Sequence, residues 1–280
     1  MKLGFLAGDF RDIEKAKRFG FRAIELTARS FGDPSEKSPD KKLVQQAKQL
    51  AKKHHIEITA LAYYRCATKP SDVKLAPIEY ARVFDVAEAL GIQTVATMSG
   101  FNADLDWKGN LQFFADRFGP VSKMAETRGL RVAFENWMGV WGRLPFRPIN
   151  MGGSPDTWDD WFKVVPSKAL GIEFDPSHLY WQGIDHIRAL KEYKDRVYHV
   201  HAKDTEMLAE GRYRGGVNGP IYRFRIPGYG EINWPQFISA LDEIGYQGGI
   251  AIEHEDPIYS GKRFDEGLVR GWQTLNPLIK

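Results

Sequence analysis

The chain has 280 residues, of which 43% are hydrophobic and 13% aromatic, so it is long enough to bury a large core. Its 39 basic and 36 acidic residues are interspersed, and the net charge of +3 leaves no basic stripe of the kind that binds a nucleic-acid backbone. A single cysteine, Cys66, excludes an internal disulfide and a thiolate cluster for structural zinc, which favours a reducing compartment such as the cytoplasm.

Short apolar runs alternate with helical patterns along the chain, an order typical of a parallel β-sheet. The expected strands are, in chain order, residues 2–8, 23–28, 57–63, 94–98, 131–136, 171–175, 197–201 and 249–255. Between them, apolar residues recur three and four positions apart, as in 43–51 and 234–244, which predicts helices with one apolar face. Eight such units predict an α/β fold, a single (β/α)8 TIM barrel over residues 1–280. The alternative is an open doubly wound sheet, but no glycine-rich phosphate-binding fingerprint follows the first strand.

Two connections are longer than the usual two to six residues, and both leave the carboxyl end of a strand. They are residues 137–153, after the fifth strand, and 205–233, after the seventh. Active sites of such barrels form at this end, so we expect both connections to cover a small substrate, with Trp137, Trp141 and Arg223 among the residues that contact it. The alternative is that these aromatic residues only pack the connections against themselves.

The last four strands each place a side chain that can bind a metal at the same end of the barrel. These side chains are Glu135, Asp175, His201 and Glu253. If the apolar neighbours face the helices, alternation turns all four inward, where uncompensated carboxylates would repel one another. Three carboxylates and one imidazole suit one divalent cation, with Mn²⁺ expected first and Mg²⁺, Co²⁺ or Zn²⁺ left open. No organic cofactor is expected.

Further polar residues lie near this set. His199 and Glu173 fall one layer below His201 and Asp175, either as support for the metal ligands or as a plain buried ion pair. His178 follows Asp175 and is expected to contact a substrate oxygen, with a place among the metal ligands as the alternative. Lys203 and Glu255 continue their strands inward, and a salt-bridge network competes with contact between Lys203 and an anionic oxygen.

At these residues the sequence resembles the xylose isomerase-like barrel superfamily, and within it the metal-dependent sugar isomerases and epimerases that include the ketose 3-epimerases. The motifs that carry the resemblance are AFEN, FDPSH, HVHAKD, PGYGEINW and IEHEDP. The resemblance implies the same four metal ligands, a substrate hydroxyl contact at His178, and Glu135 and Glu253 as acid and base. Trp141 and Met207 stand where ketose 3-epimerases have a glutamate and an arginine, so an ordinary ketohexose is not the expected substrate.

A metal bound to a carbonyl and its neighbouring hydroxyl makes the adjacent C–H acidic, and proton removal gives an ene-diolate. Returning the proton gives a sugar epimerase or isomerase, which is the first expectation. Expelling a β-substituent instead gives a lyase or dehydratase acting on a keto-glycoside or keto-cyclitol. A sugar-binding barrel without catalysis is a further alternative. An endonuclease of abasic DNA is disfavoured. Its trinuclear zinc site needs further histidines at the ends of the second to fourth strands and after the seventh, and no histidine occurs between His201 and His254.

The expected partner is therefore a small sugar or sugar derivative, and neither nucleic acid nor a membrane. The first ten residues lack the apolar core of a secretory signal, and no run approaches the roughly 20 apolar residues of a membrane span. A homodimer is expected only because barrels of this kind often dimerise.

Overall fold

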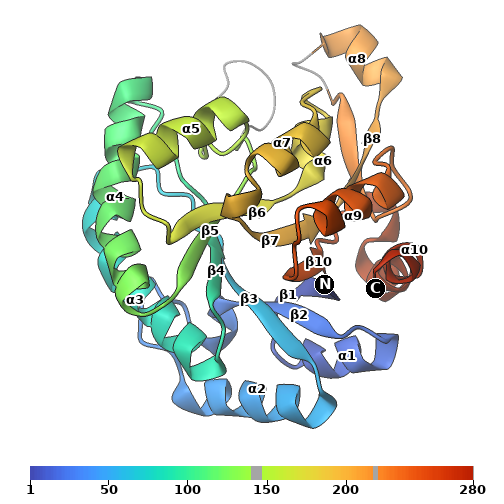
Figure 1. Cartoon of the computed structure of the whole chain (residues 1–280), viewed down its shortest axis with the longest axis horizontal. Coiled ribbons are helices and arrows are strands. Elements are labelled where there is room, and N and C mark those ends of the chain that lie inside the picture. Colours follow the sequence, from blue (N-terminus) through green and yellow to red (C-terminus); the bar gives the residue numbers. More distant parts are fainter. Residues whose placement is uncertain (140–146, 217–219, 280) are drawn as a thin grey trace.

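The computed structural model describes residues 1–139, 147–216 and 220–279 of the chain. Eight parallel strands close into a barrel in the order β1-β10-β7-β6-β5-β4-β3-β2 (Figure 1). The expected (β/α)8 barrel is confirmed, and the open doubly wound sheet is wrong. The barrel strands are β1 (Lys2–Ala7), β2 (Ala23–Thr27), β3 (Glu57–Tyr63), β4 (Thr94–Thr97), β5 (Arg131–Glu135), β6 (Leu170–Phe174), β7 (Val197–Ala202) and β10 (Gly249–Ile252).

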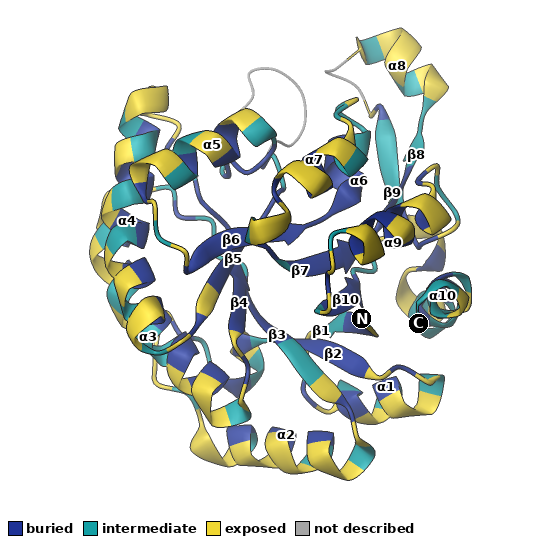
Figure 2. Ribbon diagram, in the orientation of Figure 1, coloured by how far each residue is buried: buried dark blue, intermediate teal, exposed yellow. Residues whose placement is uncertain are grey.

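Helices surround the barrel, with their outward faces exposed and their inward faces buried (Figure 2). Nine of those in the described residues are α1 (Asp12–Phe19), α2 (Lys41–His54), α3 (Ser71–Leu90), α4 (Trp107–Thr127), α5 (Pro155–Val164), α6 (Pro176–Tyr180), α7 (His186–Glu192), α9 (Trp234–Glu243) and α10 (Phe264–Leu275). Gly20 and Gly91 end α1 and α3 with φ angles of 85° and 77°, a left-handed conformation that favours glycine. No helix in the described part of the chain is long and apolar enough to cross a membrane.

Aromatic packing between the barrel and its helices sets the direction of the strand side chains. The ring of Phe134 on β5 lies 5.2 Å and 4.6 Å from those of Phe114 and Phe118 on α4, and 5.2 Å from that of Trp161 on α5. Burying each of these rings contributes about 1.5–3 kcal/mol to folding. Because neighbouring strand residues point to opposite faces, anchoring Phe134 outward turns Glu135 into the barrel.

The inside of the barrel is polar, whereas branched apolar side chains usually fill a TIM barrel. Glu25 of β2, Glu173 of β6, and His199 and His201 of β7 are completely buried there. Tyr64, which directly follows β3, places its hydroxyl among them. Buried ionisable groups are costly unless they are paired, so this interior is maintained for something other than stability alone.

The last barrel strand is shorter than the expected 249–255. Ile252 pairs with Phe5 of β1 and lies opposite Ala202 of β7, and the described pairings of both neighbours with β10 stop there. Beyond Ala202 the chain turns away into a hairpin, so Glu253 and Glu255 have no strand beside them. The prediction that strand alternation sets the direction of Glu255 is therefore wrong, because its position is set in a loop.

The connection after β7 is not simply a loop. β8 (Asp204–Met207) and β9 (Tyr222–Arg225) form an antiparallel pair, and α8 (Ala209–Gly215) lies between them in the chain. Together they project from the barrel beside α9 (Figure 1). Each strand has four residues, and both contain charged side chains. They are therefore too short and too polar to show the alternation of apolar and polar residues that predicts a strand.

A buried carboxylate fixes the base of this hairpin. Asp204 accepts hydrogen bonds from the backbone N–H groups of Gly228 and Ile232, at 2.9 and 3.0 Å, and from the indole N–H of Trp234, at 2.8 Å. The PGYGEINW stretch is thus folded around one side chain of the HVHAKD motif. These contacts fix the loop between the end of β9 and the start of α9 relative to β7.

Candidate metal centre

The four expected ligands meet at the carboxyl ends of neighbouring strands. Glu135 is the last residue of β5, Asp175 directly follows β6, His201 lies in β7 and Glu253 directly follows β10. One ligand atom of each lies within 4.8 Å of those of the other three. The side chains of Glu135, Asp175 and His201 are at most 3% exposed, whereas that of Glu253 is 13% exposed. Glu253 is therefore the member that a substrate can reach most easily.

Two features of this group favour a bound cation. The Oδ1 atom of Asp175 accepts a hydrogen bond from the Ser177 backbone, but its Oδ2 atom is buried and accepts none, although Lys203 lies nearby. The Nδ1 atom of His201 faces the Oε2 atom of Glu253 at 3.1 Å and the Oε1 atom of Glu135 at 3.7 Å. Two carboxylates supply no proton, so a proton or a metal ion has to lie at Nδ1. Three carboxylates and an imidazole fit a divalent ion.

Lys203 balances part of the negative charge. Its Nζ atom donates hydrogen bonds to Glu253 at 2.5 Å and to Glu255 at 3.0 Å, and it lies 3.2 Å from the Oδ2 atom of Asp175. The salt-bridge network that the sequence left open is thus present at the barrel mouth. Burial by itself lowers the pKa of Lys203, but these carboxylates outweigh it and hold the pKa well above its usual value, so the side chain is charged at neutral pH.

Both glutamates of the expected acid–base pair are ionised in this environment. Burial raises the pKa of Glu135, but the hydrogen bonds with His178 and His201 outweigh burial and keep the pKa well below its usual range. Burial likewise raises the pKa of Glu253, but the charge of Lys203 and the contact with His201 together outweigh burial and lower the pKa below its usual value. Two ionised carboxylates at one site can accept protons, which is what removal of a carbon-bound proton requires.

His178 lies at the edge of the same group. Its Nε2 atom is 3.3 Å from the Oε1 atom of Glu135 and 3.4 Å from the Oδ2 atom of Asp175, and its Nδ1 atom has no hydrogen-bond partner. The ring of Phe224 on β9 meets the His178 ring edge-on at 5.2 Å, and the Nζ atom of Lys203 lies 4.4 Å from the Phe224 ring centre. Phe224 is not among the substrate contacts expected from the sequence.

A second polar layer lies directly beneath the candidate ligands, and the sequence predicted only part of it. The expected pair of His199 and Glu173 forms with 2.9 Å between Nδ1 and Oε1. Glu25 was missed, although a carboxylate in the middle of the apolar AIELT run was a usable signal. Its Oε2 atom lies 2.9 Å from the Nε2 atom of His201. The Tyr64 hydroxyl lies 3.1 Å from the same nitrogen and donates to Glu173 at 2.7 Å.

The remaining expected substrate contacts lie in the two long connections. Trp137 follows β5 and is partly buried, while Trp141 falls outside the described residues. Arg223 of β9 donates through Nε and Nη2 to both carboxylate oxygens of Glu206, each at 2.7 Å. Its guanidinium is therefore held within the hairpin rather than directed at the four candidate ligands.

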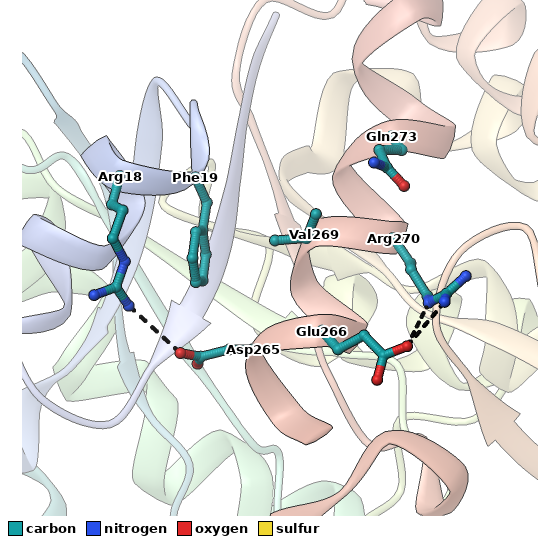
Figure 3. A pocket seen from close by; sticks show the side chains of 7 residues that line it. All are labelled: Arg18, Phe19, Asp265, Glu266, Val269, Arg270 and Gln273. Carbon is teal, nitrogen blue, oxygen red and sulfur yellow. Dashed lines mark hydrogen bonds and ion pairs between the residues drawn. The ribbon is translucent and has the colours of Figure 1, made fainter. Parts of the chain in front are cut away.

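A surface groove of about 470 Å³ lies elsewhere, on the outside of the molecule between α1 and α10 (Figure 3). Across it Arg18 pairs with Asp265 at 3.4 Å, and along α10 Arg270 pairs with Glu266 at 2.9 Å. None of the four candidate ligands lines this groove. Because its charged groups neutralise one another, we place the chemistry at the barrel mouth.

The chain matches one protein family and is similar to several curated proteins. A family model described as xylose isomerase-like TIM barrel matches residues 13–270. The uncharacterised protein YfiH of Bacillus subtilis is 33% identical over 101 residues, which is 31% of each chain. Inosose dehydratase of Clostridium beijerinckii is 26% identical over 163 residues, which is 56% of this chain and 50% of that protein. The matched stretches thus span half the length of these relatives or less.

Solved structures of similar shape include proteins with different described activities. A probable 3-DHS dehydratase, AsbF of Bacillus anthracis, gives a TM-score of 0.75 at 15% identity over 99% of both chains. The IolI protein with a bound zinc atom gives 0.75 at 19% identity over 100% and 98% of the two chains. D-psicose 3-epimerase of Clostridium cellulolyticum gives 0.67 at 19% identity over 99% and 92%. At such identities these structures bear on the fold alone.

Proposed function

Because the chain belongs to the xylose isomerase-like TIM barrel family, we propose that it is a metal-dependent lyase that removes water from a keto-cyclitol or keto-glycoside. The observation that carries the proposal is the buried group of Glu135, Asp175, His201 and Glu253 at the barrel mouth. The similarity in sequence to inosose dehydratases supports dehydration over the sugar isomerisation or epimerisation that the sequence motifs first suggested. Both reactions begin with removal of a proton next to a carbonyl.

The same four residues would hold one divalent ion, which we expect to be Mn²⁺. Bound there, the ion would polarise a substrate carbonyl and thereby increase the acidity of the neighbouring C–H group. The zinc atom in the structure of the IolI protein makes Zn²⁺ the first alternative metal to test.

Glu253 is the best placed base. It is ionised, it is the most exposed of the four side chains, and Lys203 holds its Oε2 atom in place at 2.5 Å. Taking the proton leaves the bonding electrons on the substrate as an enolate. The positive charge of Lys203, buried beside the same carboxylates, stabilises negative charge that develops on substrate oxygens.

Dehydration also requires a proton donor for the leaving hydroxyl. His178 is suited to this role because its Nε2 atom lies 3.3 Å from Glu135, which orients the ring. When the enolate electrons form the new carbon–carbon double bond, the C–O bond at the β-carbon breaks and the hydroxyl leaves as water with a proton from this pair. If the proton of this pair is instead delivered to the carbon, from the face opposite Glu253, the product is an epimer.

The test is to incubate ketoses, keto-glycosides and cyclitol ketones with the protein and Mn²⁺ in D₂O and to follow them by NMR. Loss of water with a new alkene signal supports the lyase. Deuterium uptake at one carbon without loss of water would replace it with the epimerase or isomerase. Glu253→Gln should abolish the reaction, and Glu266→Gln on the outer face of α10 is the control. No reaction in any of the three substrate classes would contradict the proposal.

A further inference from the structure

One ring nitrogen of His201 contacts the polar layer beneath the four candidate ligands and does not face the other three ligands. Nδ1 faces Glu253 and Glu135, so Nε2 points away from them into the barrel. There the Oε2 atom of Glu25 lies 2.9 Å from Nε2, and the Tyr64 hydroxyl lies 3.1 Å from it. The two ring nitrogens thus meet two separate groups of carboxylates.

A carboxylate at Nε2 decides which ring nitrogen a metal ion can use. The Glu25 oxygen can only accept a hydrogen bond, so Nε2 carries a proton, and Nδ1 is the nitrogen that a metal ion beside Glu253 and Glu135 can bind. The Glu25 side chain cannot easily move aside, because it is completely buried and its second oxygen lies against the Tyr64 hydroxyl, at 3.1 Å. The ring is therefore fixed in orientation, with Nε2 toward Glu25 and Nδ1 toward Glu253.

We propose that Glu25, held by Tyr64, is the positioning residue that makes Nδ1 of His201 available to the metal. The inference rests on the proposed metal-dependent function. Glu25 lies in β2 and Tyr64 directly follows β3, so residues from the side of the barrel without candidate ligands would also contribute to metal binding. Glu173 lies in the same layer, but its nearest imidazole partner is His199, at 2.9 Å, and it lies 3.3 Å from Nε2 of His201.

The test compares isosteric variants in the full-length protein by calorimetric titration with Mn²⁺ alone. Glu25→Gln should weaken Mn²⁺ binding by about 10–100-fold, the range typical for such outer partners of a metal ligand. Glu173→Gln should weaken it far less, and Glu266→Gln on the outer face of α10 should leave it unchanged. Equal losses in Glu25→Gln and Glu173→Gln, or unchanged binding in Glu25→Gln, would overturn the assignment.

Two further measurements separate positioning from a general structural role. The unfolding midpoint of each variant without metal reports stability, and a purely structural Glu25 would lower that midpoint without changing the Mn²⁺ affinity of the folded protein. If Glu25→Gln does not fold, Tyr64→Phe removes only the hydroxyl and should still weaken Mn²⁺ binding measurably, whereas unchanged binding would contradict the proposal. Failure of the wild-type protein to bind Mn²⁺ or Zn²⁺ would instead refute the proposed function itself.

Discussion

Phe224 places an apolar ring against the most polar part of the molecule. It contacts the edge of His178 at 5.2 Å and lies 4.4 Å from the Nζ atom of Lys203, the two side chains proposed to face substrate oxygens. A cyclic substrate has an apolar ring face made of C–H groups as well as hydroxyls. The position of Phe224 therefore suits it to bind that face while the charged groups bind the oxygens.

Replacing this ring should weaken substrate binding more than turnover. An aromatic contact is worth about 0.5–1.5 kcal/mol beyond buried area, so we expect Phe224→Ala to raise KM roughly 2–12-fold, with a smaller change in kcat. Steady-state kinetics on whichever substrate the NMR panel identifies is the measurement. Tyr213→Ala on α8, where the side chain is 83% exposed, is the control. An unchanged KM in Phe224→Ala would place the substrate elsewhere.

Cys66 is the one thiol of the chain, and its surroundings make it unreactive. Burial raises the pKa of the thiol to about 12, and the nearby charge of Glu135 adds to the effect. Because only the thiolate reacts with iodoacetamide, alkylation near pH 8 should be slow in the native protein and fast in urea. The alkylation rate of the native protein should keep rising up to pH 11. Intact-mass measurements over time give this rate. A plateau near pH 9 would show an ordinary thiol.

At the scale of elements, α10 carries a glycine for a steric reason. A Cβ atom on Gly267 would lie 2.1 Å from the Nε2 atom of His254, whose ring stacks on Phe264 at 4.3 Å. We expect Gly267→Ala to lower the free energy of unfolding by about 1–3 kcal/mol in urea denaturation. Gly119→Ala in α4, which meets nothing within 4 Å, should instead be neutral or stabilise by up to about 1 kcal/mol. Equal effects would contradict the steric argument.

The hairpin and the loop that follows it depend on Asp204. Its carboxylate is completely buried and accepts hydrogen bonds from two backbone N–H groups of the 227–234 stretch and from Trp234. Asp204→Asn replaces one acceptor oxygen by an amide that faces N–H donors, so it should cost about 2–4 kcal/mol of unfolding free energy. Thermal unfolding against the exposed variant Asp242→Asn is the measurement. A cost below 0.5 kcal/mol, within the range of surface substitutions, would show that the loop holds without it.

The sequence predicts the eight barrel strands because each is a short, mostly apolar run that alternates with a helical pattern. It does not predict β8 and β9, whose four residues each include charged side chains paired across the hairpin, as Arg223 is with Glu206. The predicted strand 249–255 is also longer than β10. β10 ends where its neighbour β7 turns away, and β7 is distant from it in the chain. Local patterns contain no information about either event.

The same distinction holds for the site as a whole. Glu135, Asp175, His201 and Glu253 are recognisable because four consecutive strands each end in a side chain that can bind a metal. Glu25 comes from the opposite half of the barrel and has no partner in sequence, so only closure of β1 against β10 brings it to His201. Residues that recur at the ends of successive strands can be predicted from the sequence. A contact that forms only when the barrel closes, such as that of Glu25 with His201, cannot.

At the scale of the whole molecule, a bound metal should raise the stability of the fold, because the four ligands come from strands that separate on unfolding. A ligand present at 1,000 times its Kd adds about 4.1 kcal/mol of unfolding free energy, which corresponds to a rise of roughly 5–15 °C in Tm. Thermal unfolding with Mn²⁺ and with EDTA is the measurement. Asp175→Asn is a matched control, because Asn caps the start of α6 as well as Asp does while removing the charge. The shift should disappear in that variant, and a shift of the same size in both proteins would mean that Mn²⁺ binds somewhere other than the barrel mouth.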